Sequence, residues 1–568
     1  MKRSRTSSGK STVFASGLPC KRASATSAFD VRCWVLDVQR TLAIGPLALT
    51  GIIFAASLLL TSCSTPPPPV LTPIGAAVPA AAPTNAAAPV TPLPEGPIRI
   101  TVMDAILQGL ENNRALRVQR LGPALRRTFE QEREGVFDPV FSAQLSRQAS
   151  KAEQPSGSGT GLTNSDVTTV SGSVGLSKTF ATGTKVSLDS TTSLKDSSLY
   201  ADEFDTTRGG VSVTQSLLRG GRWSANLASL RQARLDTLSS EYELRGYAEA
   251  LVARIESTYW DYALAQRQIE IVTDSLKLAE QQLADTRERI AIGKTAQVEL
   301  SAAEAEVAAR QADLINARSA LDQVRLHFLA LLNPPGTNTF QREVALLEQP
   351  ATPEARLDDV AAHVGVARRM RPDLNQARLA ARRGTLEVVK TRNGVLPKLD
   401  LFINLGSSGY ADSFGRSANR ANGDFYDAEA GVALEYPLGN NDAEARNERA
   451  RLGADQAAET LANMEQLVEV DVRSAYVEVQ RAREEVTAVG VLVRRRQDAW
   501  RAETEKFGVN KSTTLLVAQA QRDLLAAQIQ LERAVADHLK SFISLYRLEG
   551  SLLDRRAISA PGRDPAMP

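Results

Sequence analysis

The chain has 568 residues, of which 23% are charged and only 5% are aromatic. One compact core does not normally reach this size, and so few aromatic residues argue against a large globular enzyme. Residues 1–40 hold eight Lys/Arg and two Asp, so removing residues 1–62 leaves 59 basic and 63 acidic side chains and a net charge of −4. This remainder is not basic, which argues against a nucleic-acid partner.

The first segment with a clear pattern is an export signal that ends at Cys63. A basic flank ending at Arg40 precedes an uncharged run, TLAIGPLALTGIIFAASLLL, and then small residues lead to the cysteine. The sequence Leu60-Thr61-Ser62-Cys63 resembles the lipobox of bacterial lipoproteins, which implies cleavage before Cys63 and a covalent lipid on its sulfur. The same resemblance implies sorting to the outer membrane, because the residue after the cysteine, Ser64, is not Asp. The alternative is a retained signal-anchor helix, because an apolar run of this length can span a bilayer.

No cysteine follows Cys63; the other two are Cys20 and Cys33. The processed chain can therefore hold no disulfide and no thiolate metal site, and we expect no cofactor besides the lipid. Residues 63–97 form the expected anchor and a Pro/Ala-rich tether, PPPPVLTPIGAAVPAAAPTNAAAPVTPLPEGP, which cannot build a core. Extended as polyproline, roughly 30 such residues would reach about 90 Å.

From residue 98 the same order of predicted elements occurs twice. The first half, 98–335, opens with a helix over about 101–135, for which Thr101 is a suitable N-cap. β-like segments between 138 and 217 follow, and then a helical hairpin over about 222–332.

The second half repeats this order after a linking segment at 336–370. Its first helix begins at Arg371-Pro372-Asp373-Leu374, where proline suits a first helical turn. This repetition indicates an internal duplication. The remaining expected segments are the second half as a whole at 371–550, strands at 397–410 and 425–437, a hairpin at about 441–549, and a C-terminal tail at 551–568.

Both hairpins place apolar residues at alternating spacings of three and four. This 3.5-residue period predicts coiled-coil arms, and arms of about 50 residues would extend ~75 Å, which no compact domain needs. His538 falls on such an apolar seam, which indicates packing rather than a ligand role. In the first arm the seam includes Leu251, Ile255, Tyr262, Ile269, Leu276, Leu283 and Ile290.

The β-like segments alternate apolar and polar residues. In 398–406, leucine or isoleucine occupies positions 399, 401, 403 and 405, and 428–436 alternates in the same way. About ten residues of this pattern suit a tilted strand that crosses a bilayer. An ordinary soluble hairpin would show the same alternation, so this pattern alone leaves both interpretations open.

Taken together, these features resemble the TolC-like outer-membrane efflux protein family over nearly all of 98–550, in a lipoprotein-type member. The resemblance implies an α+β membrane protein with an internal two-fold repeat. Three copies would form one transmembrane β-barrel, continued by a long periplasmic coiled-coil barrel of helices. The matching segments are Arg371-Pro372-Asp373-Leu374, VTQSLLRGG (213–221), LEYPLGNN (434–441), RIAIGKTAQVELSAAEA (289–305) and KFGVNKSTTLLVAQAQ (506–521).

The resemblance also implies a function. The chain would be the outer-membrane channel of a tripartite efflux or type I secretion system, passively conducting substrates from an inner-membrane pump of the RND or ABC type. A periplasmic adaptor protein would contact the hairpin tips, and the barrel would contact outer-membrane lipid. The implied adaptor contacts are Gly293, Lys294, Thr295, Gly508, Val509 and Asn510.

Two features depart from the familiar family plan. The first half has room for two strands or for four, at 138–147, 169–180, 184–193 and 209–217, so a trimer would close with twelve strands or with eighteen. The family often narrows the periplasmic mouth with acidic residues, but Thr514 and Val517 stand at those positions here. Glu299 is the only carboxylate in register, so a gate built from these three residues would be less charged.

No set of residues indicates catalysis or an energy source, so we expect a channel and not an enzyme. The main alternative is a structural coiled-coil outer-membrane lipoprotein without a channel. An adaptor subunit is a further alternative, but it would lack the twofold strand–hairpin order. The sequence does not identify the exported substrate.

Overall fold

The computed structural model describes residues 97–155, 161–197, 203–294, 296–336, 339–351, 357–422, 424–509 and 511–562, all within the unit Ile74–Pro568. The predicted signal, Cys63 and the tether lie outside these residues, as do Thr295 and Asn510. Among the described residues, no helix combines the length and apolar character that crossing a membrane requires.

The expected helix over 101–135 is two helices, α3 (Val102–Asn112) and α4 (Arg114–Glu134). Thr101 caps α3 in a reciprocal capping box with Asp104, as its sequence predicts. The single-helix prediction was wrong at Asn113, whose extended backbone (φ −63°, ψ 117°) interrupts the helix. The Asn113 side chain accepts a hydrogen bond from the Leu116 N–H at 3.0 Å, so the same residue ends one helix and caps the next.

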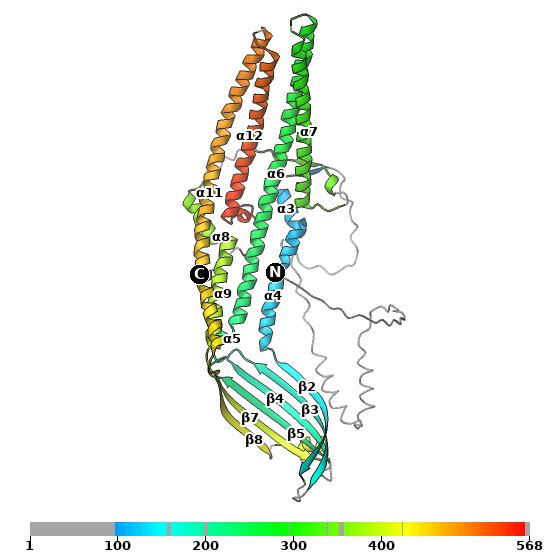
Figure 1. Ribbon diagram of the computed structural model, residues 1–568, viewed down its shortest axis with the longest axis vertical. Helices are drawn as coiled ribbons and strands as arrows, with labels where there is room; N and C mark the ends of the chain where they lie inside the picture. Colours follow the sequence, from blue (N-terminus) through cyan, green and yellow to red (C-terminus); the bar gives the residue numbers. More distant parts are fainter. Residues whose placement is uncertain are drawn as a thin grey trace, which may run out of the picture. The chain divides into compact units, whose positions relative to one another are not determined.

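Six antiparallel strands form one sheet in the order β2-β3-β4-β5-β7-β8 (Figure 1). The first half of the chain contributes four of them and the second half two, so the four-strand alternative is the one observed. A tight turn at Thr182-Gly183 joins β3 to β4, with Gly183 at φ +81°. A short helix, α10 (Phe414–Arg420), connects the last two strands. The strands are β2 (Val140–Pro155), β3 (Leu162–Thr179), β4 (Thr184–Ser197), β5 (Phe204–Ser216), β7 (Lys398–Ala411) and β8 (Tyr426–Glu435).

Two helical hairpins run away from one end of this sheet (Figure 1). The first arm of each is longer than expected, because α6 has 64 residues and α11 has 68. At 1.5 Å per residue each would span roughly 100 Å. The second arms have 35 residues each, so α6 and α11 continue past them toward the sheet, where α4 and α9 pack alongside. The helices are α5 (Trp223–Asn226), α6 (Ala228–Ala291), α7 (Val298–Leu332), α9 (Pro372–Gly394), α11 (Asn441–Gly508) and α12 (Thr514–Leu548).

A belt of small elements packs on α6 and α11 between the sheet and the hairpin tips (Figure 1). We use "belt" for α3, β1, β6, α8 and α13. β1 pairs with β6 in parallel, and Leu552 and Leu553 of α13 are fully buried in the largest apolar cluster. Residues 551–562, expected only as a tail, are therefore part of the fold. The bounds are β1 (Ile98–Ile100), β6 (Val344–Leu346), α8 (Val360–Met370) and α13 (Leu552–Arg555), with 3-10 turns at Gly135–Phe137 and Thr339–Gln341.

Candidate functional site

The sheet has one apolar face, and the strand register aligns its side chains. Val211 of β5 lies opposite Leu188 of β4 and Leu405 of β7, and Leu401 lies opposite Val432 of β8. Many of these side chains are open to the surroundings; Leu434, for example, is 69% exposed. An apolar surface this extensive requires cover by another protein surface or by lipid.

The opposite face is polar and carries a network of charges. Arg208 of β5 reaches across β7 to Asp427 of β8, with contacts of 2.6 and 3.2 Å to its two carboxylate oxygens. A Cβ on Gly406, which lies between them, would come within 2.6 Å of Asp427 and 2.8 Å of Arg208. Asp189 lies 3.7 Å from the other side of the same guanidinium. The absence of a side chain at position 406 therefore permits this cross-strand pair.

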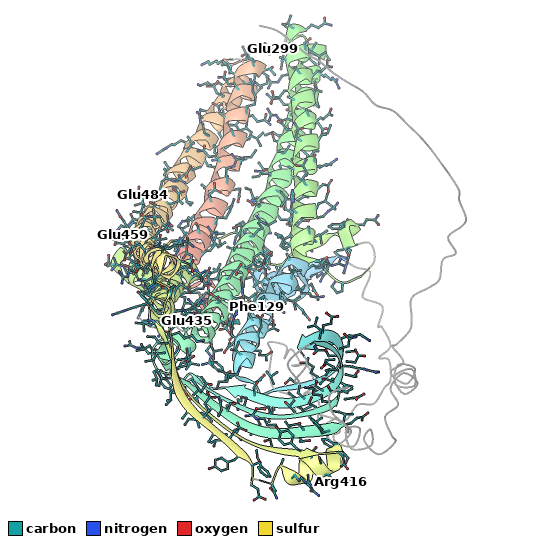
Figure 2. All side chains as sticks on the ribbon, turned by 60° about the horizontal axis from the view of Figure 1, so that its bottom comes forward. Phe129, Glu299, Arg416, Glu435, Glu459 and Glu484 are labelled. Atoms are coloured by element: carbon teal, nitrogen blue, oxygen red, sulfur yellow. The ribbon has the colours of Figure 1, made fainter. Side chains whose placement is uncertain are left out.

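Exposed aromatic side chains mark both ends of the sheet. Near the helical end they include Phe180, Trp223 and Tyr436, and near the far end Tyr426. In Figure 2, Glu435 marks the helical end of the sheet and Arg416 of α10 marks the far end. An apolar band between two aromatic girdles is typical of strands that cross a membrane.

The two edge strands of the sheet, β2 and β8, each pair on one side only within the described residues. They are 16 and 10 residues long. Long unpaired edges expose backbone N–H and C=O groups that favour pairing with another strand. One chain therefore presents an open sheet with two edges that another copy could complete.

The structure brings the three gate candidates together at the distal end of the hairpins. The Glu299 carboxylate, at the start of α7, accepts a hydrogen bond from the Thr514 backbone N–H at 3.2 Å (Figure 2 shows Glu299 at this end). Thr514 and Val517 are only 1% and 3% exposed, because α12 packs there against α6 and α7. Close by, Arg289 donates to the Phe507 carbonyl at 3.1 Å and lies over the Phe507 ring. These contacts join the two hairpins of one chain; the part of these residues in a gate stays a prediction.

The predicted adaptor-contact residues lie on the turns of the hairpins. Gly293, Lys294, Gly508 and Val509 are all exposed. Gly293 has φ +69°, a left-handed conformation that glycine adopts at little cost. Adaptor binding at these positions stays a prediction.

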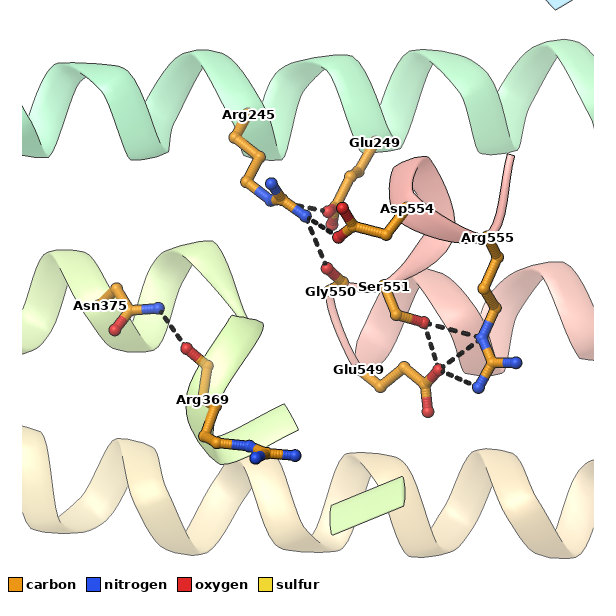
Figure 3. Close-up of polar contacts among 9 residues, drawn as sticks. All are labelled: Arg245, Glu249, Arg369, Asn375, Glu549, Gly550, Ser551, Asp554 and Arg555. Atoms are coloured by element: carbon orange, nitrogen blue, oxygen red, sulfur yellow. Dashed lines mark hydrogen bonds and ion pairs between the residues drawn. The ribbon is translucent and has the colours of Figure 1, made fainter. Parts of the chain in front are cut away.

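A buried ionic network in the belt was missed by sequence reasoning (Figure 3). Arg245, only 1% exposed, contacts Glu249 at 3.2 Å, Asp554 at 2.6 Å and the Gly550 carbonyl at 3.2 Å. Burial raises the pKa of Glu249 to about 8, and the nearby Arg245 guanidinium, which lowers this pKa, does not offset the effect of burial. The i,i+4 spacing of Arg245 and Glu249 can be read from the sequence, but their partner Asp554 lies about 300 residues away and could not be predicted.

Glu549 is the centre of a second buried cluster in the belt. It is fully buried and accepts hydrogen bonds from Ser551, from Arg555 at 3.0 Å, and from His363 Nδ1. Burial alone would raise the pKa of Glu549, but the hydrogen bonds from His363 and Ser551 outweigh it and lower the pKa. His363 is thereby assigned a structural partner.

His538 packs against Phe542, with ring centroids 5.1 Å apart, and is 2% exposed. This burial agrees with the packing role predicted from its seam position and lowers the pKa of His538. Within the ranges that the structure covers, no group of three or more His, Cys, Asp or Glu side chains is arranged to hold a metal ion.

Comparison with known proteins agrees with this architecture. The model of a family described as "Outer membrane efflux protein" matches residues 108–333 and 364–551. The outer membrane protein TolC of Vibrio cholerae serotype O1 is 23% identical over 357 residues, covering 62% of this chain and 78% of TolC. The pyoverdine export outer membrane protein OpmQ of Pseudomonas putida is 27% identical over 351 residues, covering 59% of this chain and 67% of OpmQ.

The crystal structure of the outer membrane protein VceC of Vibrio cholerae has the same fold. It superposes with a TM-score of 0.59 at 16% identity, over 79% of this chain and 96% of VceC. The resemblance to the outer-membrane efflux family predicted from the sequence is thus confirmed.

Proposed function

Because the chain belongs to the outer membrane efflux protein family, we propose that three copies form one channel that conducts solutes passively across the outer membrane. The observation that carries this proposal is the sheet, with its exposed apolar face, its charged opposite face and its two open edges. Lipid would cover the apolar face, and the charged face would line water.

Closure of the barrel follows from the edges. In a symmetric trimer, β8 of one copy would pair with β2 of the next, which removes every open edge. Three sheets of six strands would give eighteen strands, and not the twelve of the alternative weighed from the sequence. The two separate matches to the family, at 108–333 and 364–551, support the proposed internal duplication.

The hairpins would then form a helical tunnel beneath the barrel. Substrates would reach it from an inner-membrane pump of the RND or ABC class through a periplasmic adaptor. The exposed tips support adaptor contact, because the partner would need side chains and backbone that the chain itself leaves free. The proposed contacts are Gly293, Lys294, Thr295, Gly508, Val509 and Asn510.

The gate would be the junction between the two tips. The Glu299–Thr514 hydrogen bond and the Arg289–Phe507 contact favour a closed arrangement, and Val517 lies buried beside them. Opening would require the hairpins to part. A passive channel has no energy source for this, so adaptor or pump contacts would have to bind the open state more tightly.

A lipid on Cys63 would anchor the chain to the outer membrane. The motif Leu60-Thr61-Ser62-Cys63 supports this part of the proposal. Growth with radiolabelled palmitate should label the protein, and Cys63→Ala should abolish the label. Labelling that persists in Cys63→Ala, or a mature N-terminus elsewhere than Cys63, would reject the anchor and leave the channel untouched.

Conductance in planar bilayers tests the channel itself. The purified protein should migrate as a heat-sensitive trimer and should produce stepwise ion currents. A structural coiled-coil lipoprotein would give no current. A protein that stays soluble without detergent after its lipid is removed would also contradict the channel.

A further inference from the structure

A groove of about 530 Å³ lies between α6 and α12 at the level of the belt. Its charged lining residues are all basic: Arg254 from α6, and Lys540 and Arg547 from α12. Apolar or weakly polar side chains complete it, among them Leu251, Ile543 and Ser544. The groove therefore combines positive charge with apolar surface.

Three of the basic residues of α12 are evenly spaced along the helix. Arg533, Lys540 and Arg547 are seven residues apart, a spacing that returns to the same face of a coiled-coil helix. Arg533 lines a neighbouring hollow between α6, α7 and α12. At 1.5 Å per residue these three residues cover roughly 21 Å along the helix.

Two of the three basic residues that line the groove have no acidic partner among the described residues. The guanidinium groups of Arg254 and Arg547 are exposed and make no hydrogen bond or ion pair with any residue that the structure describes. Lys540 differs, because Asp261 lies 2.6 Å and Asp537 3.2 Å from its ammonium group. Glu243 is exposed further along α6 and does not line the groove. The groove thus keeps a net positive charge.

The groove and the belt lie on opposite sides of α6. Glu249 and Glu256 face the belt, where Arg245 and Arg556 contact them. Arg254 is five residues after Glu249 and two before Glu256, which at 3.6 residues per turn turns it roughly 140–160° away. In a trimer whose strands and helices form a complete channel, the belt has room only on the outside, because inside it would block the lumen. The groove then faces the lumen.

We propose that this groove, repeated in each copy, is a positively charged site in the lumen that attracts anionic solutes bearing a carboxylate or phosphate beside an apolar group. The inference rests on the proposed trimeric channel. Positive charge on a confined wall raises the local concentration of anions, and the apolar lining favours solutes with an apolar part. The channel is accordingly anion-selective.

Reversal potentials of the full-length trimer in a potassium chloride gradient across a planar bilayer test the selectivity. The native channel should pass chloride in preference to potassium. The double variant Arg254→Glu/Arg547→Glu should lower the chloride-to-potassium permeability ratio by about tenfold, the lower end of what one-signed clefts achieve. Because both side chains are exposed and unpaired, folding should survive, and Arg254→Gln/Arg547→Gln should give a smaller shift in the same direction.

A matched control changes two exposed arginines that do not line the groove, Arg99→Glu/Arg114→Glu, and should leave the ratio unchanged. Potassium benzoate should reduce the chloride current of the native channel more than that of the groove variant. The inference is overturned if the native channel prefers potassium, or if the groove variant keeps the native chloride-to-potassium permeability ratio. In either case, measurable conductance would still support the proposed channel. Complete absence of conductance in the native protein overturns both.

Discussion

The Glu299 carboxylate accepts a hydrogen bond from the backbone N–H of Thr514, and this contact of 3.2 Å links the starts of α7 and α12. The first N–H groups of a helix have no partner within the helix, and its N-terminus attracts negative charge. Glu299 therefore satisfies a donor that α12 cannot satisfy itself. It does so across the two hairpins, which makes the contact sensitive to their separation.

Glu299→Ala should favour the separated tips. Losing a partly exposed charged hydrogen bond costs about 1 kcal/mol, so the open-to-closed ratio should rise about fivefold. Open probability in planar bilayers measures this. The control is Glu304→Ala, because Glu304 lies on α7 like Glu299 but pairs only with the exposed Arg287 of α6, within the first hairpin; it should leave gating unchanged. Native gating in Glu299→Ala would show that this contact does not hold the tips closed.

Local periodicity predicted much of the fold. The alternation of Leu399, Leu401, Ile403 and Leu405 identified a strand and its apolar face, and the 3.5-residue period located the long arms. The sequence predicted that β2 ends at residue 147, but the strand continues to Pro155. Its outer part, after Leu145, has no large apolar residues that would indicate a strand. Both signals are local, so they report which side of an element is buried and not what buries it.

Contacts between distant segments could not be predicted. β1 and β6 are three-residue strands about 240 residues apart, too short to give a periodic signal. Arg556 binds the buried Glu256 through contacts of 2.8 and 2.7 Å, although the sequence offers only two isolated charges. At the tips, the positions of Glu299, Thr514 and Val517 came from a resemblance, but their burial between hairpins depends on tertiary packing.

The two faces of β7 should respond oppositely to a new charge. Ile403→Arg places a cation on the apolar face, which costs about 2–4 kcal/mol at the middle of a bilayer. Asn404→Arg places it on the charged face, where Glu429 lies within hydrogen-bonding distance of Asn404. We expect Ile403→Arg to reduce heat-sensitive trimers in outer-membrane fractions and Asn404→Arg to preserve them. Equal trimer yields would contradict the assignment of lipid to the apolar face.

Gly550 should be essential for docking the C-terminal segment into the belt. It has φ +74°, and a Cβ there would lie 2.8 Å from Cα of Arg371 and 2.9 Å from the carbonyl carbon of Met370. These are backbone atoms that cannot easily move, so Gly550→Ala should destabilise the belt by about 2 kcal/mol or more. Thermal unfolding followed by helical circular dichroism measures this. Gly365→Ala within α8 meets no atom within 4 Å and should be neutral or slightly stabilising.

Glu249 should make the stability of the belt fall as pH rises. Its folded-state pKa of about 8 exceeds the ordinary value of 4.5, so between these values the folded chain keeps a proton that the unfolded chain has lost. The free energy of unfolding should therefore decrease by on the order of 1 kcal/mol per pH unit across this window. Glu549 acts in the opposite sense, because its pKa is lowered and its stabilisation is lost only under acidic conditions.

Glu249→Gln separates this effect from other titrations. Glutamine keeps the shape of the protonated side chain and cannot ionise, and Asp554 still pairs with Arg245. The melting temperature of the native protein should therefore fall relative to that of Glu249→Gln as pH is raised from 6 to about 8. The difference between the two proteins cancels the contributions of other groups, including His538. Parallel melting curves over this range would mean that Glu249 is already ionised in the fold, held so by Arg245.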